Sequence, residues 1–236
     1  MTPALFKDFF PPAVSVFFTA RTADFTLPEG AEGLSPTQKD YLSQKLGIAD
    51  DKIFTIRQMH GNKILAITGR DLPQKGAVPQ ADGAVTNTPG IILSVRTADC
   101  LPIFLFDPGK KCIALVHAGW RGSSEKIVVQ AITMMQEKYG SPSADLLVAL
   151  GPSIRACCYE VSEEFKDVFP QEVSRHKGRF YLDLSLANKH QLMELGVKAG
   201  NIFDPQQCTV CDQQFFSYRR DKEKAGRHLS LFTINR

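Results

Sequence analysis

Residues 91–124 read IILSVRTADCLPIFLFDPGKKCIALVHAGWRGSS, and this stretch decides the fold. Three short runs rich in β-branched and aromatic residues are separated by Asp, Pro and Gly, as strands are: Ile91–Val95, Pro102–Phe106 and Cys112–Val116. Several are apolar on consecutive residues, so these strands should be buried on both faces. A glycine-rich loop follows. A helix is then expected from about Ser123 to Tyr139, because its apolar residues keep helical spacing.

Regular structure is expected on both sides of this stretch. After a loop over residues 26–36, Ser35 should cap a short helix that has Pro36 in its first turn and ends before Gly47. The other expected elements are strands Ile53–Arg57, Lys63–Thr68, Gly83–Thr86, Leu146–Leu150 and Ser230–Ile234, and helices Val161–Phe169 and Leu184–Leu195. Strands and helices are mixed without strict alternation. This favours one α+β domain over residues 1–236, a layered α/β sandwich with mixed β-sheets, over a doubly wound parallel sheet.

The composition is that of an ordinary globular protein. Of 236 residues, 43% are hydrophobic and 22% charged, which is ample material for a core. The net charge of +3 is too small to indicate nucleic-acid or membrane binding, but it is compatible with a basic pocket for a small anion. No run reaches the roughly 18 apolar residues of a membrane span, and the N-terminus lacks a secretory pattern, so a cytoplasmic location is expected. The oligomeric state stays open.

The six cysteines are too sparse for a disulfide-stapled secreted domain, so most should be free thiols or ligands. Cys157 and Cys158 are adjacent, which disfavours a bond between them and suggests burial rather than redox activity. Cys208 and Cys211 have the spacing of a zinc half-site or a redox pair. A second pair with this spacing is missing, which argues against a structural four-cysteine site.

Three residues form a candidate metal site. His60 lies at a strand end beside a turn, and His117 ends the strand Cys112–Val116. Cys100 lies in a polar break between two apolar strands. Two imidazoles and one thiolate suit Zn²⁺ or copper, and three protein ligands leave a position for water or substrate. The alternatives are a turn histidine at His60 and an inert core thiol at Cys100.

Other polar residues surround these three in the sequence. Asp99 could orient a ligand histidine, or it could be a turn residue. The loop that contains Gly119, Arg121 and Gly122 leads into a helix, and such a loop binds anions through free N–H groups, the helix dipole and the arginine fork. It lacks the Walker pattern, and a capped helix with a surface arginine is the alternative. Cations near the C-terminus form either a solvated basic face or a wall of the anion pocket; they include Arg219, Arg220 and His228.

Several motifs together resemble the bacterial laccase-domain family, also described as multicopper polyphenol oxidase-like or as laccase-domain purine nucleoside phosphorylases. The motifs occur in the family's order and are Gln58-Met59-His60-Gly61, Thr97-Ala98-Asp99-Cys100-Leu101-Pro102, His117-Ala118-Gly119-Trp120-Arg121-Gly122, Gly151-Pro152-Ser153-Ile154, Cys157 with Tyr159-Glu160-Val161, and Phe216-Ser217-Tyr218-Arg219-Arg220 with Gly226-Arg227. The resemblance implies a single-domain layered sandwich, similar to cysteine hydrolases, with a metal, usually zinc, on His60, Cys100 and His117. Arg155 departs from the small residue common in the family, which puts the shape of that loop in doubt.

The resemblance also implies a choice of activities. The first is phosphorolysis of adenosine, inosine or methylthioadenosine, with possible adenosine deamination, so the expected partners are a purine nucleoside and phosphate. A three-ligand zinc suits deamination because it lowers the pKa of its bound water to about 7. Asp99 and His228 are the candidate proton donors to the purine.

Three alternatives use the same residues. A multicopper laccase needs many histidines in His-X-His pairs, and the five here contain no such pair, so only a weak single-copper polyphenol oxidation remains. A metal-independent cysteine amidase would use Cys100 as nucleophile and His117 or His60 as base, acting on a peptidoglycan precursor. A binding module without turnover is the third alternative.

Overall fold

The computed structural model describes residues 5, 6, 8–27, 30, 31, 33–48, 50–72 and 77–235. Its strands form three sheets. In sheet order, the four-stranded sheet consists of β1 (Val14–Phe18), β13 (His228–Ile234), β5 (Ile92–Thr97) and β2 (Ile53–Phe54). The six-stranded sheet consists of β12 (Ile202–Phe203), β8 (Leu147–Leu150), β6 (Leu101–Asp107), β7 (Cys112–Ala118), β4 (Gly83–Thr86) and β3 (Ile64–Ala66). Both contain parallel and antiparallel pairs, as expected of mixed sheets.

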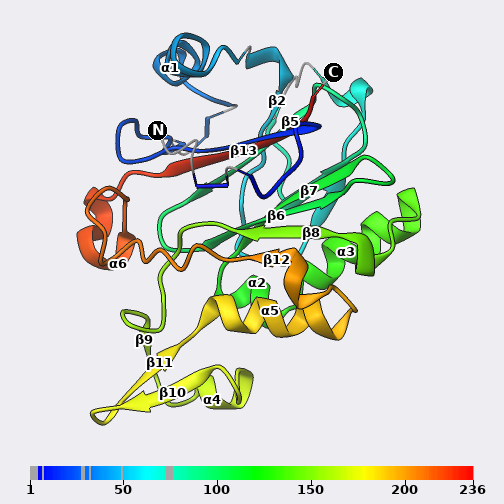
Figure 1. The fold of residues 1–236 in the computed structure, drawn as a ribbon. Coiled ribbons are helices and arrows are strands. Elements are labelled where there is room, and N and C mark those ends of the chain that lie inside the picture. Colours follow the sequence, from blue (N-terminus) through cyan, green and yellow to red (C-terminus); the bar gives the residue numbers. More distant parts are fainter. Residues whose placement is uncertain are drawn as a thin grey trace.

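The third sheet and the helices complete the molecule. The small sheet consists of β10 (Val173–His176), β11 (Arg179–Leu182) and β9 (Glu160–Val161), and it projects from the body of the protein (Figure 1). The helices are α1 (Pro36–Leu46), α2 (Trp120–Ser124), α3 (Ile127–Tyr139), α4 (Phe165–Val168), α5 (Leu184–Glu194) and α6 (Tyr218–Asp221). Among the described residues, no helix is long and apolar enough to cross a membrane.

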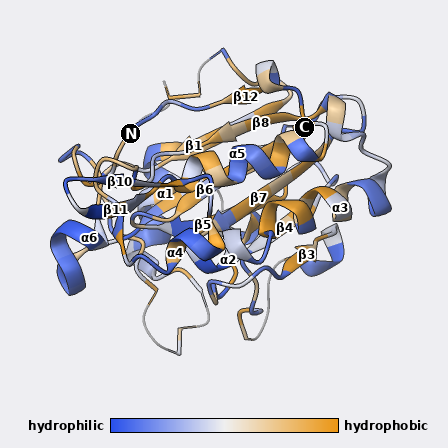
Figure 2. Ribbon diagram, turned by 90° about the horizontal axis from the view of Figure 1, so that it is seen from below, coloured by the Kyte–Doolittle hydropathy of each residue, from blue (hydrophilic) through white to orange (hydrophobic). Residues whose placement is uncertain are grey.

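The alternation of side chains along β6 explains the layered packing. Ile103 and Leu105 join a core with residues of α3 and α5, whereas Phe104 and Phe106 join a second core between the two large sheets. A third core lies between α1 and the outer face of the four-stranded sheet and includes Leu42. The order of layers is therefore helix, sheet, sheet, helices (Figure 1), and Figure 2 shows hydrophobic residues along β7 and α3. The predicted α+β layered sandwich is confirmed.

Local signals predicted several elements correctly. The side chain of Ser35 accepts from the N–H of Gln38, and the Gln38 side chain accepts from the Ser35 N–H, so α1 begins with a capping box. Gly47 ends this helix with φ of 64°, the left-handed conformation that favours glycine. Residues 28, 29 and 32 of the predicted loop lie outside the described part of the chain.

Two predicted helices are wrong in extent. The helix predicted over 123–139 is two helices, because Lys126 has φ of 60° and interrupts the helical backbone between α2 and α3. The helix predicted over Val161–Phe169 is reduced to one turn, α4, and Val161 belongs to strand β9.

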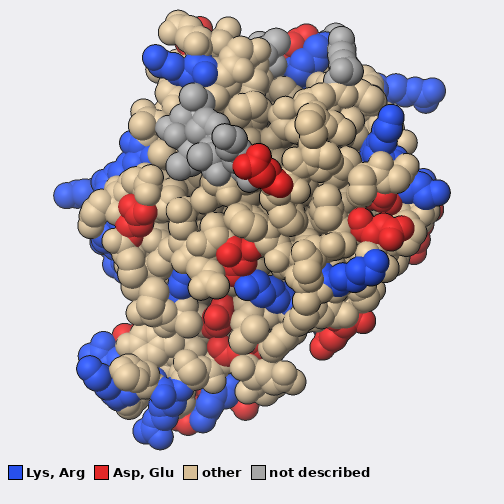
Figure 3. All heavy atoms as spheres, viewed as in Figure 1, with Lys and Arg blue, Asp and Glu red and all other residues tan. Residues whose placement is uncertain are grey.

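Lys and Arg side chains gather over the β10–β11 hairpin at the lower left of Figure 3, where Arg175, Lys177 and Arg179 are exposed.

Candidate active site

Strand register brings Cys100 and His117 together. β6 pairs with β7 so that Pro102 faces His117 and Leu101 faces Ala118, which places the residue before β6 beside the end of β7. The turn that holds Cys100 joins β5 of one large sheet to β6 of the other, and Asp99 in this turn has φ of 90°. The Cys100 thiol therefore lies at the edge where the two sheets meet.

Asp82 assembles the rest of the site. It precedes β4, which runs beside β7, and its backbone carbonyl accepts from the His117 N–H at 2.7 Å. Its carboxylate accepts from the N–H groups of Met59, His60 and Gly61 at 3.1, 2.8 and 2.9 Å. Asp82 Oδ1 also lies 2.9 Å from His117 Nδ1. One buried carboxylate thus holds both the loop that carries His60 and the ring of His117.

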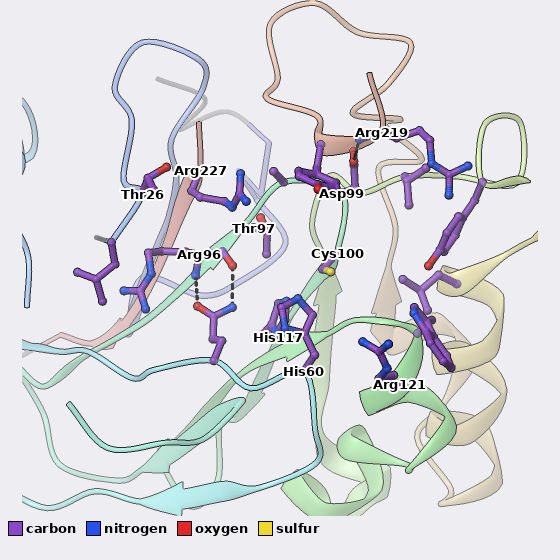
Figure 4. A pocket seen from close by; sticks show the side chains of 18 of the residues that line it. Thr26, His60, Arg96, Thr97, Asp99, Cys100, His117, Arg121, Arg219 and Arg227 are labelled. Atoms are coloured by element: carbon purple, nitrogen blue, oxygen red, sulfur yellow. Dashed lines mark hydrogen bonds between the residues drawn. The ribbon is translucent and has the colours of Figure 1, made fainter. Parts of the chain in front are cut away.

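The three predicted ligands meet. One ligand atom each of His60, Cys100 and His117 lies within 4.8 Å of the others (Figure 4). The two imidazole rings are 4.8 Å apart and nearly perpendicular, at 86°. Because Asp82 occupies Nδ1 of His117, the Nε2 atom of that ring is left to coordinate, which is the usual arrangement around a metal-binding histidine. The donor set and the orienting carboxylate fit a metal ion.

The charges at this centre favour a thiolate. Burial alone would raise the pKa of Cys100, but the charge of His117 and hydrogen bonds from His117 and His60 lower it to about 6. Burial would likewise lower the pKa of His117, but Cys100 and Asp82 raise it to about 9. Hydrogen bonds from His117, Gly61 and His60 outweigh burial and hold the pKa of Asp82 below its usual value. At neutral pH the thiolate is therefore paired with an imidazolium that Asp82 stabilises.

The two glycines of the predicted anion loop serve close packing. A Cβ on Gly119 would lie 3.3 Å from Cys100 Sγ and 3.4 Å from His60 Cδ2. A Cβ on Gly122 would lie only 2.7 Å from the backbone oxygen of Gly61. At Gly122, helix α2 therefore approaches the His60 loop more closely than a side chain allows, and at Gly119 a side chain would be a tight fit against Cys100 and His60. Neither glycine is among the residues that line the adjoining cavity.

The centre opens into a cavity of about 770 Å³. The cavity is lined by Thr26, Leu27, Arg57, Gln58, His60, Arg96, Thr97, Ala98, Asp99, Cys100, His117, Trp120, Arg121, Ile154, Tyr159, Leu184, Tyr218, Arg219 and Arg227. Its five arginines face a single carboxylate, that of Asp99, so the cavity favours an anion. Arg121 stacks on Trp120 at 4.6 Å and Arg219 on Tyr159 at 5.3 Å, which presents aromatic faces and cations together.

Buried donors without partners lie in the cavity wall. Arg96 is 8% exposed, and its Nη2 donates to the carbonyl of Ile56, but its Nη1 has no hydrogen-bond partner among the described atoms. The Oγ1 of Thr97, which is 2% exposed, is also unpartnered within the described part of the protein. Burial and the nearby charge of Arg57 lower the pKa of Arg96 to about 10. Such groups are costly unless a ligand satisfies them.

Asp99 and Arg220 make other contacts than predicted. Asp99 does not bind a ligand histidine; its oxygens accept from Thr209 Oγ1 and the Arg219 N–H, both at 2.6 Å. The guanidinium of Arg220 donates to carbonyls of the 209–215 loop and to Asp221, so it holds that loop and does not line the cavity. Arg219 and Arg121, in contrast, do line it.

His228 lies in the core, away from the cavity lining. Its Nδ1 is 2.6 Å from the Thr19 carbonyl, and its Nε2 accepts from the Phe216 N–H at 2.7 Å. Burial lowers its pKa to about 4. The predicted role in proton donation therefore has no geometric support. His176 is exposed and His190 lies 2.6 Å from Glu172, so two of the five histidines reach the centre.

Sequence reasoning missed Asp82, Arg57 and Arg96. Asp82 could have been noticed as an acidic residue directly before the apolar strand 83–86, and Arg96 as a lone cation at the end of an apolar run. Neither position shows from sequence alone which partner it faces. Gln58 links the His60 loop to strand β5, because its side chain exchanges two hydrogen bonds with the Arg96 backbone (Figure 4).

Comparison with known proteins identifies the family and supports the fold. The family model described as "Multi-copper polyphenol oxidoreductase laccase" matches residues 37–235. A purine nucleoside phosphorylase of Aquifex aeolicus (strain VF5) is 33% identical over 202 residues, 84% of this chain and 92% of that protein. Adenosine deaminase RL5, from an unknown prokaryotic organism, is 34% identical over 201 residues, 79% of this chain and 76% of that protein. The crystal structure of YlmD from Geobacillus stearothermophilus has a TM-score of 0.85 at 27% identity and covers 95% of this chain and 93% of that chain. This chain therefore belongs to the laccase-like multicopper polyphenol oxidoreductase family.

Proposed function

We propose that this chain is a purine nucleoside phosphorylase that acts on adenosine, inosine or methylthioadenosine, with adenosine deamination as a further reaction at the same centre. The observation that carries the proposal is the cavity itself. It joins unpartnered buried donors, aromatic faces and the group of His60, Cys100 and His117 in one space. The names of two relatives, a purine nucleoside phosphorylase and an adenosine deaminase, support the same class of substrate.

The cationic part of the cavity suits phosphate. Arg96 Nη1 and Thr97 Oγ1 are donors without partners among the described atoms, and Arg57 and Arg227 line the same cavity. Guanidinium groups match phosphate oxygens in a bidentate geometry. In phosphorolysis a phosphate oxygen bonds to the ribose C1′ while the C1′–N9 bond breaks and its electron pair leaves with the purine. Fixing the phosphate in line with C1′ is the contribution that these residues would make.

The aromatic part of the cavity suits a purine. Trp120, Tyr159 and Tyr218 contribute to its lining, and each of them carries an arginine over its ring. Aromatic rings bind a flat heterocycle through offset or edge contacts. Asp99, whose oxygens are both occupied, fixes the backbone of Arg219 in the same wall.

A metal ion, zinc or copper, would be held by His60, Cys100 and His117. When bound, it would supply a Lewis acid and lower the pKa of a coordinated water. The chain itself keeps Cys100 as a thiolate, orients His117 through Asp82 and holds His60 through the backbone N–H groups around it. Cys100 is thus already the thiolate that ligates a metal, whereas His117 would give up its Nε2 proton on metal binding and keep Nδ1 toward Asp82.

Product analysis tests the proposal. Purified protein should release adenine and ribose 1-phosphate from adenosine only when phosphate is present. Arg96→Gln should raise the KM for phosphate about 10- to 100-fold, because a hydrogen bond to a charged group contributes about 1.5–3 kcal/mol, while the KM for adenosine changes less. Arg70→Gln, at an exposed position, is the matched control. Equal adenine release without phosphate, or an unchanged phosphate KM in Arg96→Gln, would contradict the proposal.

A second candidate is a metal-independent cysteine amidase that acts on a peptidoglycan precursor. The observation that favours it is the pairing of Cys100 with His117, which Asp82 orients as in a nucleophile–base–carboxylate arrangement. Chelation separates the two candidates. An amidase would keep its activity after the metal is removed, whereas the phosphorylase and the deaminase would lose theirs.

A further inference from the structure

Four cysteines outside the catalytic centre form a cluster. Cys157, Cys158, Cys208 and Cys211 each offer a sulfur, and all four atoms lie within 4.8 Å of one another. The Sγ of Cys211 is 3.7 Å from that of Cys157 and 3.4 Å from that of Cys158. The sequence argued against such a site, because only one pair has metal-ligand spacing. The structure supplies the second pair from adjacent residues.

Backbone hydrogen bonds join the two segments that carry these cysteines. Ser153 and Cys208 form a parallel bridge, and the Thr209 N–H donates to the Ser153 carbonyl at 3.1 Å. Residues 156–158 form a turn rather than a strand, so adjacent side chains need not point to opposite sides. The cluster is therefore fixed by the backbone and not by chance contact of surface thiols.

The sulfur separations distinguish a metal site from a disulfide. A disulfide has sulfurs about 2.05 Å apart, much closer than any pair observed here. A tetrahedral zinc with Zn–S bonds of about 2.3 Å places its sulfurs about 3.8 Å apart. The two separations that involve Cys211, 3.7 and 3.4 Å, are close to this spacing. The cluster thus already has nearly the size of a four-thiolate cage.

The backbone around Cys208 also favours a thiolate. N–H groups of Cys211, Arg155 and Val210 form hydrogen bonds to the Cys208 sulfur, and these bonds outweigh burial, so they lower the pKa of this thiol. Hydrogen bonds from N–H groups to sulfur stabilise negative charge on it. Burial and neighbouring thiols raise the pKa of Cys157 and Cys158, so these thiols would lose their protons on metal binding rather than before it.

We propose that Cys157, Cys158, Cys208 and Cys211 bind one zinc ion in a closed structural site, separate from the centre at His60, Cys100 and His117. Four thiolates leave no position for substrate, which is the mark of a structural zinc. Thiolate ligands also accept Cu(I) or iron, but four sulfurs at separations near those of a tetrahedral zinc cage favour zinc.

The proposed zinc would hold one wall of the cavity in place. Ile154 precedes the first pair of cysteines and Tyr159 directly follows it. Both residues line the cavity, as does Arg219, which lies beyond the second pair in the sequence. Thr209, inside the second pair, donates to Asp99, which in turn accepts from the Arg219 N–H. Loss of this ion should therefore loosen the wall that carries Tyr159 and Arg219.

Zinc content in a set of variants tests the proposal. Cys100→Ser removes a ligand of the first centre, so zinc that this variant retains, about one ion per chain, reports on the four-cysteine site. Cys208→Ser/Cys211→Ser should lose that zinc, and the combination of all three changes should hold none. Cys112→Ser, at a buried cysteine away from both centres, is the control and should keep the wild-type content. None of these counts depends on whether the chain is a phosphorylase.

A second measurement covers variants that fail to fold. Full-length Cys100→Ser protein, stripped of zinc under reducing conditions and loaded with Co²⁺, should show the intense absorption of cobalt bound by four thiolates. Three results would each overturn the proposal. They are unchanged zinc in folded Cys208→Ser/Cys211→Ser, iron or copper in place of zinc in freshly purified protein, and a disulfide among these cysteines in place of metal.

Discussion

At the scale of single residues, Asp82 does more than any ligand to shape the centre. Its backbone carbonyl and its two carboxylate oxygens form hydrogen bonds with His117 and with the backbone of the loop that carries His60. A histidine can present either ring nitrogen, and the hydrogen bond at Nδ1 decides which one faces Cys100. The ligand geometry therefore depends on a residue that itself binds neither metal nor substrate.

Asp82→Asn should weaken zinc binding at the first centre by about 10- to 100-fold, as is usual when the orienting partner of a ligand histidine is lost. The amide keeps the size of the side chain but loses the negative charge that stabilises His117. Zinc affinity, measured by chelator competition in a Cys208→Ser/Cys211→Ser background, reports the effect. Asp107→Asn, at a buried aspartate at the opposite end of β6, should leave it unchanged. Equal affinities in the two variants would contradict the role of Asp82.

The Cys100 thiol should be reactive in metal-free protein at neutral pH. Its pKa is lowered to about 6, so its alkylation rate should rise as pH increases through 6 and then level off. Burial and neighbouring thiols raise the pKa of Cys157 to about 11, so alkylation there should still be rising above pH 9. Peptide mapping by mass spectrometry after a short pulse of iodoacetamide measures both rates. A midpoint for Cys100 near 9 would contradict the thiolate assignment.

At the scale of elements, the position of the short helix α2 depends on Gly122, which has no side chain. Gly122 lets the helix contact the backbone of the His60 loop directly. The interruption at Lys126 then redirects the chain into α3, which covers the six-stranded sheet. A single straight helix over 123–139 would not allow both contacts.

Gly122→Ala should therefore disturb the first metal centre. The added Cβ would lie 2.7 Å from the Gly61 oxygen, a backbone atom that cannot move without moving His60. We expect a loss of about 1–3 kcal/mol in the free energy of unfolding, together with weaker zinc binding. Gly200→Ala is the matched control, because nothing lies within 4 Å of its Cβ position. Thermal unfolding with and without zinc tests the pair, and similar behaviour of both variants would refute the packing argument.

At the scale of the whole molecule, two sheets packed face to face bury a histidine that has no counterion among the described residues. His228 begins β13, is fully buried and satisfies both ring nitrogens with backbone groups in its neutral form. Phe18 and Phe216 surround its ring. This arrangement lowers the stability of the folded state only at acidic pH, where the ring would have to be protonated.

His228 should contribute to acid instability. The unfolded chain protonates this residue near pH 6.5, whereas the folded chain does so only near pH 4. Between these values the unfolded state binds more protons, so stability falls as pH is lowered, by up to about 3 kcal/mol. His228→Gln should lower stability at pH 7 but flatten the pH dependence between 6.5 and 4. Urea unfolding across this range measures the slope, and a wild-type slope in the variant would contradict the assignment.

The sequence alone predicted much of this protein. Consecutive apolar residues identified the buried strands of residues 91–118, and the capping residues of α1 marked its ends, because both signals act over a few neighbouring positions. Strand β1 was not predicted, although its residues are mostly β-branched or aromatic, and the strands of the β9–β11 sheet were not predicted because they are short and contain charged or polar residues. The three candidate ligands were recognised from residue type and motif, and the structure brings them together.

Only the tertiary structure decided which polar groups face one another. Asp82 takes the place predicted for Asp99, and Arg96 lies with an unpartnered nitrogen in the cavity wall. Cys157 and Cys158 meet a cysteine pair that lies some fifty positions further along the chain. The physical reason is that residue chemistry belongs to each position, whereas these distances depend on strand register and on how two sheets pack, which are set by contacts between segments far apart in the sequence.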